Sequence, residues 1–241
     1  MVKKLLKSLS IITVLTVLAI PSFAHAKIAV VGSPTSWGNY GSASSGSFSV
    51  TTSGTNRTLI CFTSENFSET VTSITYGGVP MTNISRLLFK SGSATYIDAY
   101  YLKNPALGTN TLAVSFSGNY GDVSCLPFKG TDQTTQPDAY NNGTYSETIP
   151  TVASITPTTN SWIIVNNYNP DGVISGDPDM IINGYFAGQS NFLVDKVSSI
   201  AGSQSVSYTA NVSSGRGANW IAVSVRSDNL SSSNLLMAMN Y

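Results

Sequence analysis

The chain contains almost no histidine, few charged residues and only two cysteines. Its one histidine, His25, lies in an N-terminal segment that we expect to be removed, so the mature protein would have none. This lack excludes Ser-His-Asp hydrolases, Cys-His nucleophiles and histidine-ligated zinc sites. Two cysteines alone cannot complete a thiolate zinc site either.

Charged residues make up 10% of the sequence, where about 25% is usual in globular domains. Ser, Thr, Asn and Gly take their place, which favours β structure because Glu, Lys and Arg are the residues that cover solvated helix faces. Without Lys3, Lys4 and Lys7, 9 basic residues remain against 12 acidic ones, with no run of like charge. We therefore expect no nucleic-acid partner.

Residues 1–26 have the layout of an export signal. Basic residues come first, an apolar stretch runs from Leu9 to Ile20, and Ala24-His25-Ala26 places small residues at a cleavage site. The apolar stretch is shorter than the roughly 20 residues of a membrane-spanning helix. We predict cleavage after Ala26, no membrane span, and a protein that is secreted or held at the cell surface.

The rest of the chain predicts an all-β fold, because short β-branched and aromatic runs bounded by Gly, Asn, Ser and Pro recur and no stretch keeps helical spacing for three turns. So many short strands need two packed layers, since a single sheet would leave one apolar face in water. We predict a two-sheet antiparallel β-sandwich that forms a single domain over residues 27–228, followed by a tail at 229–241. The predicted strands are 28–31, 47–52, 57–63, 71–76, 84–89, 95–102, 110–116, 122–128, 161–167, 180–186, 192–198, 204–210 and 219–226.

Cys61 and Cys125 each lie inside an apolar run, and two interpretations of them stay open. Export favours a disulfide between them, and closing a loop of about 65 residues would stabilise the fold by about 4 kcal/mol. The alternative is a pair of buried free thiols that pack as small hydrophobic side chains. The spacing alone does not decide between the two.

Five segments occur in a specific order: SITYGGVPMT (73–82), AYYLKNPALGTNTLAVSFSG (99–118), FKGTDQTTQPDA (128–139), a WIIV strand and a closing NWIAVSVR (219–226). This succession resembles a widespread group of secreted and phage-associated β-sandwich modules of jelly-roll type. The resemblance implies a jelly-roll sandwich displayed outside the cell, with concanavalin-like and immunoglobulin-like sandwiches as alternative folds. It supplies no catalytic residue.

Several aromatic residues lie among Gly, Asn and Ser, outside any alternating run that would bury them. Exposed rings beside amides can stack on sugar faces while the amides bond hydroxyl groups. The candidate ligand-binding residues are therefore Trp37, Tyr40, Tyr120, Tyr140 and Tyr145. The alternative is that these rings cap the ends of the sandwich. Trp162 and Trp220 lie inside strand-like runs, and we expect them in the core.

The segment NYNPDGVISGDPD matches part of a calcium-binding loop, but the position that should hold a bidentate glutamate is Pro178. The residues that could supply oxygen ligands are Asn167, Asn169, Asp171, Asp177 and Asp179. A structural calcium ion is one interpretation of this segment, and we expect no other cofactor. The alternative is that Asn, Asp, Gly and Pro simply form turns there.

Glycoside hydrolysis needs two carboxyl groups on either side of the scissile bond. Glu65 and Glu69 lie together in SENFSE, and we interpret both as solvated loop charges. We therefore expect a non-enzymatic binding or adhesion module that recognises carbohydrate or a surface polymer through Tyr-, Asn- and Gly-rich loops. A structural surface or fibre component that assembles with its own copies is the alternative, and a carbohydrate-active enzyme is the least favoured interpretation. The sequence sets no oligomeric state.

Overall fold

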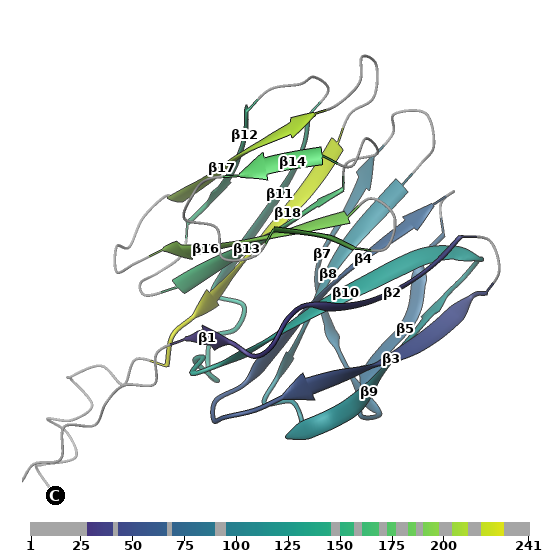
Figure 1. Ribbon diagram of the computed structural model, residues 1–241, viewed down its shortest axis with the longest axis vertical. Helices are drawn as coiled ribbons and strands as arrows, with labels where there is room; N and C mark the ends of the chain where they lie inside the picture. The colour runs from purple at the N-terminus through teal and green to yellow at the C-terminus, as the bar shows by residue number, and fades with distance from the viewer. Residues whose placement is uncertain are drawn as a thin grey trace, which may run out of the picture.

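The computed structural model describes residues 28–40, 43–66, 69–89, 95–145, 150–156, 161–168, 173–176, 183–186, 190–197, 204–211 and 218–228. These residues form eighteen strands in four antiparallel sheets and contain no helix (Figure 1). Among them, accordingly, there is no helix that could cross a membrane. The predicted export signal at 1–26 and the predicted tail at 229–241 lie outside the described residues.

Sheet A lies at the centre of the first half of the chain, with the strand order β1-β10-β4-β8-β7 and β2 also paired with β10. On β4, Leu59 and Cys61 face one side while Ile60 and Phe62 face the other, and all four are at most 1% exposed. Both faces of sheet A are therefore buried. Its strands are β1 (Ala29–Val30), β2 (Thr35–Tyr40), β4 (Thr58–Asn66), β7 (Thr82–Phe89), β8 (Thr95–Lys103) and β10 (Tyr120–Lys129).

Sheet B covers one face of sheet A and has the strand order β3-β9-β5-β6. From β2 onward, most successive strands cross from one sheet to the other, except at the β5–β6 and β7–β8 hairpins. The first and last long strands, β2 and β10, lie side by side. The orders β2-β10-β4-β8 and β3-β9-β5-β6 are those of a jelly roll, which is built from two Greek keys. The strands of sheet B are β3 (Ser45–Thr52), β5 (Val71–Tyr76), β6 (Val79–Pro80) and β9 (Gly108–Phe116).

A proline explains why the edge of sheet A is made of two short strands. β2 pairs with β10 up to Cys125, and β1 pairs with it from Phe128 onward. Between them Val31 donates its N–H to the carbonyl of Pro127, at 2.9 Å. The N–H and C=O of one residue in an antiparallel strand point to the same neighbour, so the donor that Pro127 lacks would have faced this edge. The ladder breaks where that donor is missing.

The second half of the chain repeats the topology of the first. Sheet C has the order β11-β18-β13-β16-β15, which corresponds to β2-β10-β4-β8-β7, and sheet D has the order β12-β17-β14, which corresponds to β3-β9-β5. The strands of sheet C are β11 (Ala139–Tyr145), β13 (Ser161–Tyr168), β15 (Asn183–Phe186), β16 (Ser190–Val197) and β18 (Ala218–Arg226). Those of sheet D are β12 (Pro150–Ile155), β14 (Val173–Gly176) and β17 (Gln204–Asn211).

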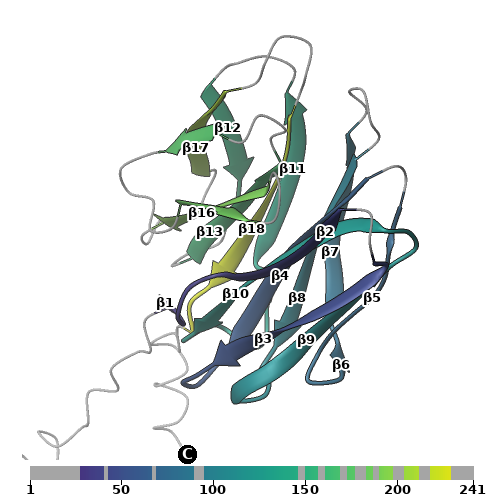
Figure 2. The same ribbon diagram turned by 45° about the vertical axis from the view of Figure 1, so that its right-hand side comes forward.

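The two sandwiches pack through sheets A and C. Ile60 and Leu126 of sheet A belong to one core cluster with Ile164 and Val223 of sheet C. The opposite face of sheet C is buried as well, as Val165 at 0% exposure shows, and β12 of sheet D packs against β18. The sheets thus stack in the order B, A, C, D, as Figures 1 and 2 show from two directions.

The structure confirms the all-β antiparallel sandwich, and each predicted strand overlaps an observed one. It contains two two-sheet sandwiches in sequence rather than one. The two sandwiches share the core between sheets A and C, which is compatible with a single domain. That residues 27–228 fold as one unit stays a prediction. Cys61 and Cys125 are paired residues of β4 and β10 and form a disulfide, with their Cα atoms 4.1 Å apart. The strands that the sequence did not predict are β2, β6, β11, β12 and β14.

Candidate functional site

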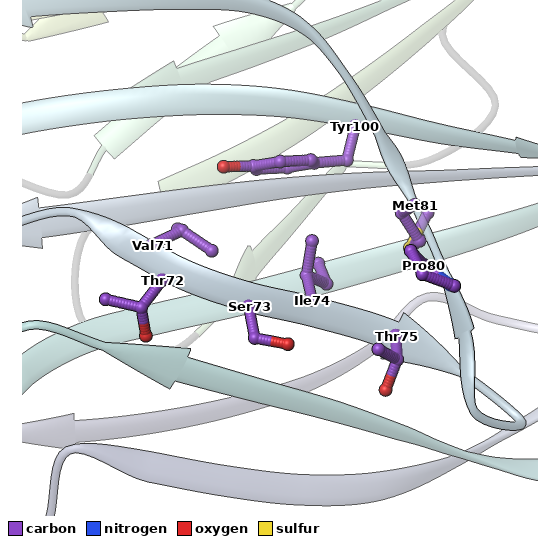
Figure 3. A pocket seen from close by; sticks show the side chains of 8 residues that line it. All are labelled: Val71, Thr72, Ser73, Ile74, Thr75, Pro80, Met81 and Tyr100. Carbon is purple, nitrogen blue, oxygen red and sulfur yellow. The ribbon is translucent and has the colours of Figure 1, made fainter.

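A pocket of about 270 Å³ opens at the edge of the first sandwich, between β5 of sheet B and β8 of sheet A. Figure 3 shows the side chains that line it. None of them is charged, which favours an uncharged ligand. The lining residues are Val71, Thr72, Ser73, Ile74, Thr75, Pro80, Met81 and Tyr100.

A tight turn creates one wall of the pocket. Gly77 and Gly78 have φ values of 57° and 79°, in the left-handed region that glycine adopts without strain, and they fold β6 back onto β5. β6 is so short that it pairs only with Thr75 and Tyr76. Within the described residues, the outer edge of β5 from Val71 to Ser73 therefore has no partner strand. Its backbone groups border the pocket.

Tyr100 forms the opposite wall. Ile74 and Met81 lie toward its ring, whereas the hydroxyl groups of Ser73 and Thr75 point to the other side of β5 (Figure 3). The Tyr100 side chain belongs to the core between sheets A and B. Its burial, and next the negative charge of Asp98, raise the pKa of the phenol above its ordinary value, so Tyr100 stays neutral at physiological pH.

Two buried carboxyl groups lie beside Tyr100 on the same face of sheet A. Asp98 is two residues before Tyr100 on β8, and Glu65 lies on the neighbouring β4; each is 1% exposed. Asn83 donates from Nδ2 to Asp98 Oδ1 at 3.3 Å, and the Arg86 guanidinium lies 3.9 Å from Asp98 Oδ2. Both carboxyl groups thus face the interior of the sandwich.

Burial dominates the electrostatics of this pair. It raises the pKa of Glu65 well above the usual range, and the neighbouring Asp98 carboxyl group raises it further. Burial also raises the pKa of Asp98, although Arg86 acts in the opposite direction. The two groups are close enough that the ionisation of one opposes that of the other.

The structure corrects the interpretation of Glu65 and Glu69 as solvated loop charges. Glu65 is a strand residue in the core. Glu69 accepts hydrogen bonds from the backbone N–H groups of Asn119 and Tyr120, at 3.1 and 2.8 Å, and so holds the turn between β9 and β10. A local motif could not show this, because the partners of Glu69 are about fifty residues away in the chain.

The predicted ligand-binding aromatics lie on strands rather than in loops. Trp37 on β2 is partly buried against the core, and its ring stacks on Phe116 with centroids 6.4 Å apart. Tyr120 and Tyr140 begin or lie in strands and are 36% and 55% exposed. Tyr40 is the register partner of Tyr120.

Tyr145 is the last residue of β11. The side chains of Tyr40 and Tyr145 lie outside the described part of the structure. The structure does not show these five aromatics together in one site, because only three of their side chains are described, so ligand binding by them stays a prediction. The expectation for the other two aromatics is met, since Trp220 is 7% exposed and Trp162 packs on the core beside Phe128.

The predicted calcium loop lies mostly outside the described residues. Asn167 belongs to β13, but its side chain and the residues Asn169, Asp171, Asp177 and Asp179 lie outside the described ranges. Among the residues that are described, no three acidic, cysteine or histidine side chains come together as metal ligands. Calcium binding by this loop stays a prediction.

Comparison of the chain with protein-family models, with curated proteins and with solved structures finds no match. A function is therefore inferred from the residues of the site itself.

Proposed function

We propose that the protein is a non-enzymatic extracellular binding module, and that it takes an uncharged ligand, a carbohydrate first of all, in the pocket beside β5. The observation that carries the proposal is the make-up of this pocket. It combines an aromatic ring and apolar side chains with a free strand edge, and it has no charged side chain. The extracellular location rests on the predicted signal at residues 1–26.

These groups match the two kinds of surface that a sugar ring presents. The C–H faces of a pyranose pack on apolar and aromatic groups, here Val71, Ile74 and Tyr100, while its hydroxyl groups need donors and acceptors. The outer edge of β5 supplies both from its backbone. A charged ligand would gain no ion pair in this pocket, so neutral sugars are the favoured class.

A glycan array with the mature protein tests the proposal, and one pocket variant locates the site. Val71 is partly buried and points toward Tyr100 (Figure 3), so Val71→Phe should fill the pocket with little change to the surface. We expect this variant to lose binding at least tenfold. The matched control is Tyr140→Ala, which removes an exposed ring on sheet C and should leave pocket binding intact.

Two outcomes would contradict the proposal. A blank array at high protein concentration would remove carbohydrate as the ligand. Binding that survives Val71→Phe and disappears with Tyr140→Ala would move the site from the pocket to the exposed tyrosines.

The open edge of β5 also favours a second candidate function, a surface or fibre component that assembles with its own copies. An unpaired strand edge is a template for another strand. Thr72→Pro would remove a backbone donor at the bulge between Val71 and Ser73. If assembly uses this edge, light scattering should show larger particles for the unmodified protein than for the variant. A monodisperse monomer in both cases would rule it out.

A further inference from the structure

The core between sheets A and B contains a cluster of buried oxygen atoms that lack hydrogen-bond partners in the surrounding residues. Four of them have no hydrogen-bond partner outside the cluster within the described residues: Thr63 Oγ1, both carboxylate oxygens of Glu65, and Asp98 Oδ2. Apart from the charge of Arg86, the Glu65 carboxyl group interacts among these residues only with its neighbours in the cluster, Thr63 and Asp98. Thr63 is 0% exposed and is the direct register partner of Asp98, and Glu65 follows two residues later on the same face of β4. The four oxygens therefore point into one small region.

Buried oxygens of this kind need a counterpart, because leaving them unpaired costs free energy. The residues that sheet B places opposite this face are apolar, among them Ile74, Val114 and Phe116. They offer neither donors nor charge. The counterpart must come from sheet A or from a bound species.

Among the described residues beside the cluster, Arg86 of sheet A is the positively charged one, and its guanidinium has other partners. The Arg86 guanidinium lies over the ring of Tyr96, 3.9 Å from its centroid, and donates to the carbonyl of Glu69 at 3.0 Å. Its distance of 3.9 Å from Asp98 Oδ2 is longer than a hydrogen bond. The other ionisable groups near the cluster, Tyr96 and Tyr100, carry no positive charge. When both carboxyl groups are ionised, two negative charges face one guanidinium, and one negative charge is left without a partner.

We propose that Thr63, Glu65 and Asp98 form a binding site for a hard cation, with Ca²⁺ as the best-fitting ion. Calcium takes six to eight oxygen ligands, carboxylates among them, with water completing the shell. The cluster provides up to four oxygens, including a carboxylate that can bind through both of its oxygens. The pocket beside Tyr100 adjoins the cluster, since Tyr100 and Asp98 share one face of β8.

The alternative counterpart is a proton shared by the two carboxyl groups. A cation and a proton predict opposite effects of pH on the stability of the protein. A cation should stabilise the protein at neutral pH, where protons are scarce, by an amount that grows with the logarithm of the cation concentration above its dissociation constant. A proton should stabilise it only as the pH falls. The choice can be made on the full-length mature protein without knowledge of its ligand.

The experiment compares melting temperatures at pH 7.5 in EDTA, in CaCl₂, in MgCl₂ and in NaCl of equal ionic strength. We expect millimolar Ca²⁺ to raise the melting temperature by about 5 °C or more. Glu65→Gln, which keeps the shape and removes the charge, should abolish this shift. Terbium emission sensitised by the neighbouring tyrosines gives a direct binding signal, and it should disappear in the same variant.

Two controls test whether carboxyl groups elsewhere in the chain hold the ion instead. Asp122→Asn changes a buried carboxyl group on the opposite face of sheet A and should keep the full calcium response. Asp177→Asn tests the predicted loop in the second half of the chain and should keep it too. A calcium shift that survives Glu65→Gln and is lost in Asp177→Asn would overturn the proposal. So would the absence of any calcium shift together with an acid stabilisation that persists in Asp122→Asn and is lost when Glu65→Gln is added, which would assign the pair a proton.

Discussion

Asp122 provides a sharp test of how burial controls the stability of this fold. It lies on β10, faces sheet C and is 4% exposed. Burial raises its pKa from 3.8 to about 8, although hydrogen bonds with Ser64 act in the opposite direction. Below about pH 4 the carboxyl group is protonated in both the folded and the unfolded chain. Between about pH 4 and about pH 8 only the unfolded chain releases the proton, so the free energy of unfolding falls as the pH rises.

The size of the effect follows from the release of one proton. Each pH unit in this window lowers the free energy of unfolding by about 1.4 kcal/mol. Asp122→Asn removes the ionisable group and keeps a side chain of the same shape that can still bond Ser64. The variant should match the unmodified protein near pH 4 and be more stable than it by about 4 kcal/mol at pH 7. Glu65 and Asp98 also have raised pKa values when no cation is bound, so in EDTA the variant keeps part of the slope.

Urea unfolding followed by tryptophan fluorescence at several pH values between 4 and 8 measures this difference. The two proteins should have equal m values, which shows that the variant unfolds from the same compact state. Parallel pH curves for the two proteins would refute the reasoning, because they would mean that Asp122 ionises equally in both states. A stability of the unmodified protein that rises from pH 5 to pH 7 would refute it as well.

Two further predictions concern the packing of the first sandwich. Replacing Cys61 and Cys125 together by alanine should lower the free energy of unfolding by about 4 kcal/mol, since the disulfide joins residues 64 apart in the chain; urea unfolding measures the loss, and an unchanged midpoint would contradict it. Gly46→Ala should cost about 1–3 kcal/mol, because a Cβ at this position would overlap the indole ring of Trp37. Ser47→Ala, on the exposed side of the same strand, is the control, and equal melting temperatures for both variants would show that the ring moves aside freely.

The sequence predicts strands best where apolar residues alternate or run together, as in β4, β10, β13 and β18. It fails at β2 and β11, whose residues TSWGNY and AYNNGTY have no such pattern. Both are strands because their neighbours β10 and β18 supply the hydrogen-bonding ladder. Tertiary pairing overrides a weak local preference in such cases. The same failure placed Trp37 and Tyr140 in loops.

The repeat of one topology in both halves of the chain has a sequence signal, which is recognised only once the structure is known. Each half contains one run that is apolar on both faces: LICF at 59–62 in the first and WIIV at 162–165 in the second. Near the end of each half a second largely apolar strand pairs with that run, β10 with β4 and β18 with β13. A strand of this kind must be central. Two such pairs in succession indicate two central sheets, and therefore two sandwiches.

The candidate site is harder to predict than the fold. Glu65 and Asp98 are separated by more than thirty residues, and only the pairing of β4 with β8 brings them together. In the sequence, SENFSE resembles a solvated loop, because the residues that Glu65 and Glu69 interact with lie far away in the chain. The pocket also depends on the short length of β6. The Gly77-Gly78 pair predicts a turn before this strand, but it does not predict how long the strand is.

The covalent link between β4 and β10 also bears on mechanical load. If the protein is held at its two ends, tension passes directly from Cys61 to Cys125 through the sulfur atoms. The segment 62–124, which contains β5 to β9, then carries no force, and about 200 Å of extended chain cannot be pulled out. The pocket beside β5 would keep its shape on a surface exposed to flow, even when the second sandwich is being drawn apart.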